Sequence, residues 1–304
     1  MAERIPSQHS GPGPGMGPDA AGEVEQLADV LRGRRVTVLS GAGLSTDSGI
    51  PDYRGPSGSL RTRKPVGYRE FVTSEEARRR YWARSTIGWP RMKEVDPNAS
   101  HHAIAALQAA GVVEDIITQN VDGLQQAAGA HNVIELHGSL AEVICLECGR
   151  TESRDELQRR LLEKNPRWLT LTAEIAPDGD AELPHDLTQT FHVPGCRHCG
   201  GVLKPNLVFF GENVPKPRVE QAANAVDDGE LLWVVGSSLT VWSGFRFVKR
   251  AGASGTPVVI TNMGETRGDP YATLCLDAPL GALLPRVAEA LTTRSPRSAP
   301  LDHS

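Results

Sequence analysis

Short apolar runs alternate with segments of helical periodicity along most of the chain. The runs are four to six residues long, end in small or polar residues, and cover residues 36–39, 113–118, 133–136, 231–235 and 257–261. Apolar residues at helical spacing predict helices over residues 21–31, 100–110 and 219–227. Buried strands that alternate with helices are typical of a parallel α/β sheet whose ligand lies at the carboxyl ends of the strands.

Four segments depart from this alternation. Residues 63–99 are rich in Arg and aromatic residues and predict short helices and loops, whereas residues 141–203 carry a CxxC pair near each end. The Gly- and Pro-rich segments 1–20 and 292–304 are expected to be disordered tails, because they hold too few apolar residues to order a chain. The folded body is therefore expected over residues 22–291.

The two CxxC pairs are the most specific chemical signal. They are Cys145 with Cys148 and Cys196 with Cys199, and 47 residues separate them. Two such pairs, each followed by glycine, predict four thiolates around one Zn²⁺, and a closed set of four thiolates makes the zinc structural. Two redox-active dithiols are the alternative. The fifth cysteine, Cys275, is expected to be a buried apolar thiol.

Composition limits the function classes. The 304 residues are 39% hydrophobic and 23% charged, with a net charge of −5, so the basic surplus of a dedicated nucleic-acid binder is missing. Uninterrupted apolar stretches stay well below the ~18 residues that a membrane-spanning helix needs. The first 20 residues lack the apolar core of a secretory signal. We therefore expect a cytoplasmic protein that binds neither nucleic acid nor membrane.

Glycines follow the first apolar run directly. Gly41-Ala42-Gly43 begins a longer motif that extends to residue 54. A Gly-x-Gly turn after a strand lets the backbone approach a pyrophosphate, although a simple tight turn would look the same. The acidic residue that grips a ribose about 20 residues later in dehydrogenases is not in its usual place.

Polar residues follow two further runs. Gln119, Asn120 and Asp122 lie within four positions after the run that ends at Thr118. They form either a polar loop cap or a set of hydrogen-bond partners for a sugar or carboxamide. His137 follows the run that ends at residue 136, where catalytic residues of open sheets collect, although a lone histidine is often structural.

Taken in order, these motifs resemble the sirtuins, which are NAD-dependent protein deacylases. The resemblance extends over residues 22–291 and is carried by GAG at 41–43, GIPDYR at 49–54, TQNVD at 118–122, LHG at 136–138, the four paired cysteines and GSSL at 236–239. Four further segments are similar to the class II branch, which includes the mitochondrial sirtuin 4 type: RYWAR at 80–84, GWP at 88–90, APDGD at 176–180 and VFFGE at 208–212.

The resemblance implies an α/β fold in two parts. A Rossmann-type parallel-sheet domain that binds NAD is expected over residues 22–62, 100–140 and 204–291. A smaller part formed by insertions comprises a helical insertion over residues 63–99 and a zinc-binding module over residues 141–203.

The resemblance also implies the reaction and its residues. NAD is a co-substrate that is cleaved to nicotinamide, and the acyl group of a protein lysine passes to ADP-ribose. His137 is the expected general base, and Asn120 helps to position the ribose and a water. The expected NAD contacts are Gly41, Ala42, Gly43, Ser45, Ile50, Asp52, Tyr53, Arg54, Gln119, Asn120, Asp122, Gly236, Ser237, Ser238, Asn262, Met263, Gly264 and Leu280. The expected acyl-peptide contacts are Val208, Phe209, Gly211 and Glu212, in a strand that pairs with the substrate backbone.

The chain departs from the family at Gln125, where a histidine is usual, and glutamine cannot carry a proton near neutral pH. The Tyr–Arg pair, three residues apart, that holds a carboxylate in desuccinylating sirtuins is not identified after Gly55, so a succinyl preference is not expected. Two alternatives remain, namely a protein mono-ADP-ribosyltransferase that uses the same pocket and a non-catalytic NAD-sensing module that binds acyl-peptides. A dehydrogenase is the weakest candidate, because the ribose-binding acid is missing.

Overall fold

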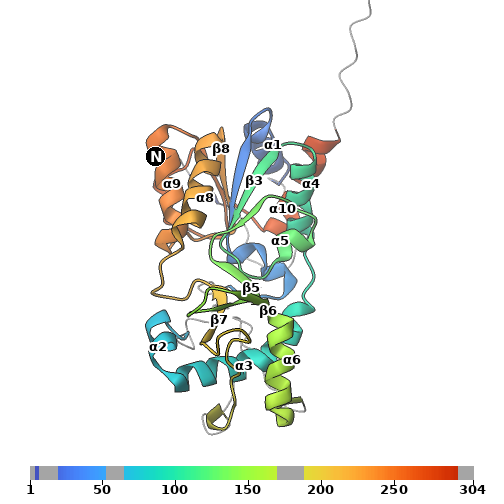
Figure 1. The fold of residues 1–304 in the computed structure, drawn as a ribbon. Helices are drawn as coiled ribbons and strands as arrows, with labels where there is room; N and C mark the ends of the chain where they lie inside the picture. The colour runs from blue at the N-terminus through green and yellow to red at the C-terminus, as the bar shows by residue number, and fades with distance from the viewer. Residues whose placement is uncertain (1–3, 7–19, 53–64, 170–187, 294–304) are drawn as a thin grey trace, which may run out of the picture.

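The computed structural model describes residues 4–6, 20–52, 65–169 and 188–293. A larger α/β domain and a smaller part lie at opposite ends of the molecule (Figure 1). The larger domain is built on a seven-stranded sheet in the order β1-β10-β9-β8-β2-β3-β4, and all of its pairings are parallel. Its strands are β1 (Arg4–Pro6), β2 (Val36–Ser40), β3 (Val113–Thr118), β4 (Val133–Glu135), β8 (Leu231–Val235), β9 (Val258–Thr261) and β10 (Leu274–Asp277). The predicted α/β fold with a parallel sheet is confirmed.

The register of the central strands determines where the polar motifs lie. Ser40 at the end of β2 pairs with Thr118 of β3 on one side and with Val235 of β8 on the other. Thr118 pairs in turn with Glu135 of β4. Four strands therefore end level with one another, and the residues that follow them meet along one edge of the sheet.

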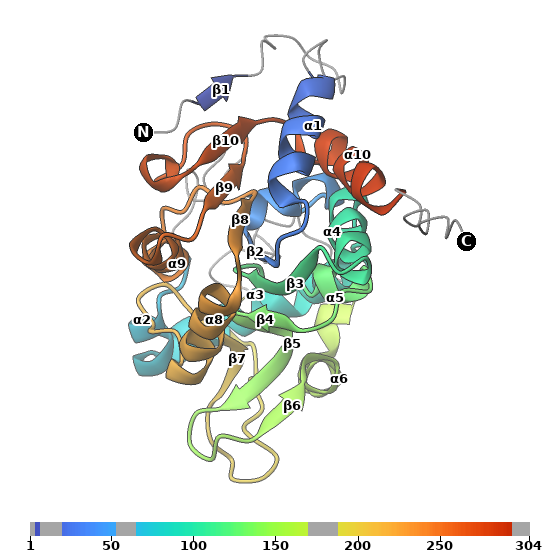
Figure 2. The ribbon, with the colours of Figure 1, turned by 90° about the horizontal axis from the view of Figure 1, so that it is seen from above.

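Helices cover both faces of this sheet (Figure 2). On one face, α1 (Ala20–Leu31), α4 (Ala99–Ala109) and α10 (Leu280–Thr292) bury leucines such as Leu27, Leu107 and Leu283 against the strands. On the other, α8 (Lys216–Asp228) and α9 (Trp242–Ser254) bury Val226, Phe247 and their neighbours. Because β2 and β8 are buried along their whole length, their sequences read as unbroken apolar runs rather than alternating ones.

The smaller part has an antiparallel sheet in the order β6-β5-β7 and its own core. Its strands are β5 (Gly138–Cys145), β6 (Thr151–Ser153) and β7 (Leu203–Leu207), and its helices are α2 (Tyr68–Thr73), α3 (Glu75–Lys93) and α6 (Arg154–Lys164). One apolar cluster joins Phe71, Tyr81 and Trp82 to Cys145, Leu157 and Phe209 among others. The described chain also holds α5 (Leu124–Ala127) and the 3-10 turns Ala42–Leu44, Thr46–Ser48, Pro166–Leu169 and Asp269–Tyr271.

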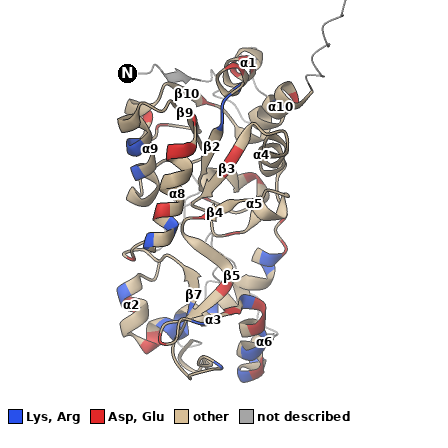
Figure 3. Cartoon of the chain, turned by 45° about the horizontal axis from the view of Figure 1, so that its top comes forward, with Lys and Arg blue, Asp and Glu red and all other residues tan. Residues whose placement is uncertain are grey.

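Charges of both signs are mixed on the surface of the smaller part. Basic and acidic segments are interspersed along α6 (Figure 3). Arg159 on this helix forms ion pairs with Glu156 and Glu163. None of the described helices combines the length and the apolar character needed to cross a membrane.

The insertion over residues 63–99 differs from the prediction of short helices and loops. The structure has one long helix, α3, which starts at the N-cap Ser74 and runs through Pro90. A proline inside a helix removes the hydrogen bond to the carbonyl four residues earlier, here that of Thr86. The side-chain amide of Gln158 on α6 donates to the Thr86 carbonyl at 2.7 Å, and this bond satisfies the carbonyl and lets the helix continue.

Two predicted boundaries also change. The smaller sheet begins at Gly138 and ends at Leu207, because β5 and β7 extend beyond residues 141–203 on both sides. The disordered tail expected over residues 1–20 is wrong at Arg4–Pro6, which pairs as β1 with the edge of β10. Backbone groups at a sheet edge accept a strand without any side-chain pattern, so the sequence carries no signal for it. Most of the two predicted tails lies outside the described residues.

Candidate active site

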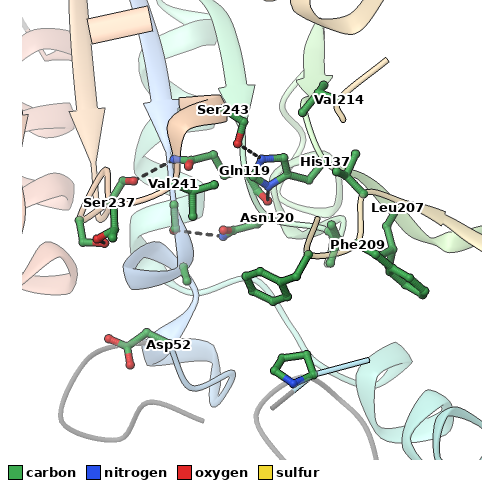
Figure 4. A pocket seen from close by; sticks show the side chains of 18 of the residues that line it. Asp52, Gln119, Asn120, His137, Leu207, Phe209, Val214, Ser237, Val241 and Ser243 are labelled. Atoms are coloured by element: carbon green, nitrogen blue, oxygen red, sulfur yellow. Dashed lines mark hydrogen bonds between the residues drawn. The ribbon is translucent and has the colours of Figure 1, made fainter. Parts of the chain in front are cut away.

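A cavity of about 920 Å³ lies where the ends of the parallel strands face the smaller part. It is lined by the residues that follow β2, β3, β4 and β8, and by α3 and the loop after β7 (Figure 4). This is the position at which open α/β sheets bind ligands. The cavity is large enough for a dinucleotide fragment together with a side chain.

The glycine motif packs the turn after β2 against the turn after β8. A Cβ atom on Gly41 would lie 2.7 Å from Ser237 Cβ, and one on Gly43 would lie 2.9 Å from the carbonyl oxygen of Gly236. The amides of Gly41 and Gly43 donate to the carbonyls of Val235 and Gly236. Contrary to expectation, these two amides are therefore engaged within the protein, and the glycines shape the floor of the cavity rather than offer free donors.

The polar residues after β3 meet Ser45 from the first motif. Asn120 Nδ2 donates to Ser45 Oγ at 3.0 Å and to the Gly41 carbonyl at 3.2 Å. Ser45 Oγ donates to Asp122 Oδ2 at 2.7 Å, while Asp122 Oδ1 accepts the Leu124 amide at 3.0 Å. Two donors thus hold the carboxylate of Asp122 in place at the edge of the cavity, where it is available to accept a hydrogen bond from an amide group of a ligand.

The buried imidazole of His101 contacts this network at Ser45. His101 Nδ1 lies 3.3 Å from the amide nitrogen of Asn98, whose side chain caps α4, and His101 Nε2 lies 3.4 Å from Ser45 Oγ. The amide of Asn98 can only donate, so Nδ1 is the acceptor and Nε2 carries the proton. Burial lowers the pKa of His101 to about 4, Asp122 opposes this shift and His102 adds to it.

His137 is held at both of its ring nitrogens (Figure 4). Its Nδ1 lies 2.9 Å from the carbonyl oxygen of Gln119, and its Nε2 lies 2.7 Å from Ser243 Oγ. A carbonyl can only accept, so Nδ1 carries the proton and Nε2 keeps its lone pair. Burial lowers the pKa of His137, the Gln119 carbonyl opposes the shift, and Arg218 adds to it. The ring is therefore a neutral base at neutral pH, with its basic nitrogen in the cavity.

Most of the expected NAD contacts line the cavity. These are Gly41, Ala42, Gly43, Ser45, Ile50, Asp52, Gln119, Asn120, Asp122, Gly236, Ser237, Ser238, Asn262 and Met263. Gln119 also joins two of the turns, because its Nε2 donates to Ser40 O and to Ser237 Oγ at 2.8 Å. Tyr53 and Arg54 lie outside the described residues.

Two expected contacts do not line the cavity. Leu280 is buried in the core beside Gly236, where it packs at the start of α10. Gly264 donates its amide to Asp277 and accepts from Asn262. Both residues follow a strand, as the residues that line the cavity do, so this position in the sequence could not tell the two groups apart.

The expected acyl-peptide contacts Val208, Phe209, Gly211 and Glu212 all line the cavity, but they form a turn rather than a strand. Glu212 fixes this turn, because its carboxylate accepts the Phe209 amide at 2.9 Å and forms a 3.0 Å ion pair with Lys204. Lys204 is buried on β7, with its ammonium over the Phe209 ring. Burial lowers the pKa of Lys204, and Glu212 opposes this shift.

Several lining residues were missed from the sequence. Tyr81 and Arg84, three positions apart on α3, both line the cavity, so the expectation that such a pair is lacking is wrong. Arg84 Nε is buried and has no hydrogen-bond partner among the described residues. Ser243 was also missed, and only the geometry identifies it. The unusual Gln125 is buried outside the cavity lining, and its amide has no partner in the described part of the chain.

The four paired cysteines come together in the smaller part. Their Sγ atoms all lie within 4.8 Å of one another, and the pairs Cys145–Cys199 and Cys148–Cys196 are 3.5 and 3.8 Å apart. Four sulfurs at such separations fit the tetrahedral site of one structural Zn²⁺, and redox pairing within each CxxC is not what the geometry favours. The backbone amide of His198 also points to Cys196 Sγ, as in zinc knuckles.

Comparisons with known proteins identify close relatives. A model of the Sir2 family matches residues 41–243. The chain is 51% identical over 277 residues to NAD-dependent protein deacetylase 1 of Streptomyces coelicolor, covering 91% of this chain and 93% of the relative. It is 52% identical over 245 residues to NAD-dependent protein deacetylase of Xanthomonas axonopodis, covering 81% and 84%.

Solved structures agree with these relatives. A Sir2 variant with a deacetylated p53 peptide and 3′-O-acetyl ADP ribose superposes with a TM-score of 0.71 and 32% identity, over 88% of this chain and 98% of the other. Sir2 with a p53 peptide and NAD⁺ superposes with a TM-score of 0.71 and 30% identity, over the same shares of both chains.

Proposed function

We infer that this chain, which belongs to the Sir2 family, is an NAD-dependent protein-lysine deacylase. NAD is consumed as a co-substrate, the acyl group passes from lysine to ADP-ribose, and zinc supports the smaller part without taking part in the reaction. The observation that carries this proposal is the orientation of His137. Its Nδ1–H is committed to the Gln119 carbonyl, so its Nε2 lone pair faces a cavity that Asn120 and Asp122 also border.

The residues of the cavity divide the work between binding and proton transfer. We assign the nicotinamide end to Ile50, Asp52 and Asp122, where the fixed Asp122 carboxylate accepts from the carboxamide. Asn120 and Gln119 orient the ribose. After the acyl oxygen has displaced nicotinamide, His137 Nε2 takes a proton from a ribose hydroxyl as that oxygen attacks the acyl carbon. The bond from the acyl carbon to the lysine nitrogen then breaks, lysine leaves as the amine, and one water molecule supplies the carbonyl oxygen of the acyl-ADP-ribose. Ser237, Ser238, Asn262 and Met263 hold the adenosine side. The enclosing walls exclude water, so that the acyl oxygen rather than water captures the ribose carbon when nicotinamide leaves.

The direct test is the variant His137→Ala, assayed with NAD and an acyl-lysine peptide. Removal of a general base lowers the rate by ~10²–10⁴, while NAD affinity should stay within a few-fold. Mass spectrometry should detect nicotinamide, deacylated peptide and acyl-ADP-ribose from the parent alone. Near-normal turnover by the variant would exclude His137 as the base. ADP-ribose added to a protein, with the acyl group retained, would instead identify a mono-ADP-ribosyltransferase, and an absence of nicotinamide release would identify a binding module.

Tyr81 and Arg84 bear on which acyl group the enzyme accepts. We propose that the deacylase accepts acyl chains that end in a carboxylate, because a guanidinium nitrogen that lacks a partner within the described chain is costly to bury unless a ligand supplies an acceptor. Succinyl- and glutaryl-lysine peptides should then compete with acetyl-lysine. The variant Arg84→Met should reduce the ratio of acidic-acyl to acetyl turnover by roughly 10–100-fold, the value of a charge-assisted bond.

A matched control lies one turn earlier on the same helix. Arg80 pairs with Glu70 and does not line the cavity, so Arg80→Met should leave the ratio unchanged. An Arg84→Met variant with the parental ratio would show that the deacylase does not read an acyl carboxylate through this side chain. The class II assignment within the family remains a prediction, as does the location in the cytoplasm.

A further inference from the structure

Ser243 occupies an unusual place for a residue with no assigned role. It lies at the second position of α9, its side chain is half-buried, and it lines the cavity. Its Oγ lies 2.7 Å from Nε2 of His137, the shortest contact that this ring makes among the described residues. Because Nδ1 of His137 is committed as a donor to Gln119, Nε2 can only accept, and the Ser243 hydroxyl is therefore the donor.

The start of α9 is packed so that this bond forms. Gly244 follows Ser243, and a Cβ atom at Gly244 would lie 2.4 Å from the side-chain oxygen of Gln119. A larger residue at this position would have to displace the Gln119 side chain, which hydrogen bonds to Ser40 and Ser237 hold in place. The same residue, Gln119, supplies the carbonyl that binds His137 Nδ1. The first turn of α9 and the loop after β3 thus each form a hydrogen bond with one ring nitrogen of His137 (Figure 4).

We propose that Ser243 is a positioning residue for the general base: its hydroxyl donates to His137 Nε2 in the resting enzyme and is replaced there by the ribose hydroxyl when NAD binds. This inference rests on the proposed role of His137 and extends it to a residue on a different element. One hydroxyl donor replaces another, so the exchange costs little, and Nε2 stays oriented and protected from water until the co-substrate arrives. Ser243 transfers no proton in this scheme, because the ribose hydroxyl gives its proton to Nε2 directly.

The expected consequence is measurable at the imidazole itself. A donor to Nε2 stabilises the neutral ring, so the variant Ser243→Ala should raise the pKa of His137 by about half to one unit, equivalent to the loss of one net hydrogen bond. The acid limb of kcat/KM should move to higher pH by the same amount. Because this bond is present only before NAD binds, the loss should appear in kcat/KM, roughly two- to twelvefold at neutral pH, and kcat should stay near the parental value. Ser243→Thr keeps the hydroxyl and should restore both properties.

The experiment combines ¹⁵N NMR titration of His137 in the NAD-free protein with pH–rate profiles. The charged residues that act on this ring or line its cavity stay unchanged in every variant, and they are Asp52, Arg84, Asp122, Glu212, Lys216, Arg218, Glu220, Arg246 and Glu265. Ser254 provides a control at the far end of α9, where its hydroxyl bonds, among the described residues, to the carbonyls of Arg250 and Ala251 and to Thr256. Ser254→Ala should leave the titration and the profile as in the parent.

Two outcomes would overturn the proposal. The first is an unchanged His137 titration in Ser243→Ala, even if the melting temperature falls, because Ser243 would then be merely structural. The second is a failure of Ser243→Thr to restore the parental pKa. Neither depends on turnover, so they are separate from failure of the deacylase assignment, which the activity of His137→Ala decides.

Discussion

Replacement of His101 by glutamine should remove a defined part of the acid sensitivity of this protein. His101 is fully buried, and its Nδ1 accepts the Asn98 amide in the capping box of α4. Protonation would place a second proton opposite that amide and a charge in the core. Glutamine at the same helix position is the usual capping-box partner, so it can accept the amide at every pH and cannot titrate.

The magnitude follows from the pKa of about 4 that burial produces, against an ordinary value of 6.5. Because the folded-state pKa lies below the unfolded one, the unfolded chain takes up the proton first as the pH falls. Stability is therefore intact above pH 6.5 and is lost progressively toward pH 4. For these two values, linkage gives a loss of about 2 kcal/mol at pH 5 relative to pH 7.

Denaturant unfolding of the parent and of His101→Gln at pH 7 and pH 5 measures this loss. Acid also weakens zinc binding and protonates His137, but both effects act equally on the two proteins and cancel in the difference. The variant should lose about 2 kcal/mol less than the parent between the two pH values. His102→Gln, at the exposed neighbouring position, removes only the smallest of the three influences on the His101 pKa and should lose nearly as much stability as the parent. Equal losses in parent and His101→Gln would refute the assignment of a neutral, buried His101.

Three further variants test other parts of the site. Cys148→Ser should abolish the one zinc per chain expected by metal analysis and expose the smaller part to proteolysis, whereas a stable, metal-free parent would contradict the zinc site. Lys204→Met leaves the partly exposed Glu212 without its cation, so we expect the free energy of unfolding to fall by about 2–3 kcal/mol and the KM for acyl-peptide to rise. Lys204→Arg should recover much of both. An unaltered KM would show that the ion pair plays no part in peptide binding. Asp122→Asn turns an acceptor into a donor, so NAD turnover and nicotinamide inhibition should weaken together while calorimetry finds ADP-ribose affinity unchanged; a matching loss of ADP-ribose affinity would place Asp122 elsewhere.

The sequence predicted those features that a local pattern encodes. Apolar runs located β2 and β8 because these buried parallel strands have no polar face, and CxxC spacing located the zinc ligands because a knuckle is a local structure. The resemblance to sirtuins then supplied the order of the site residues along the chain, most of which line one cavity.

The missed features depend on contacts between distant segments. The path of α3 through Pro90 requires a donor from Gln158, which lies on another helix. The role of Ser243 requires the register that places α9 beside His137. Tyr81 and Arg84 differ, because their three-residue spacing is visible in the sequence and only their approach to the cavity depends on the path of α3. For Pro90 and Ser243 neither spacing nor composition carries the information, because each contact joins elements that the fold alone brings together.

The hydrogen bonds between α6 and α3 have a consequence for how zinc binding and substrate binding affect each other. Gln158 donates to Thr86, and Arg154 donates to the carbonyl and hydroxyl of Ser85, so α6 holds the helix that carries Tyr81 and Arg84. The same apolar cluster contains the zinc ligand Cys145. Two binding equilibria that bias one shared body are thermodynamically reciprocal. If zinc raises the affinity for the acyl chain by some factor, a saturating acyl-peptide must raise the affinity for zinc by that same factor, which equilibrium competition with a chelator measures.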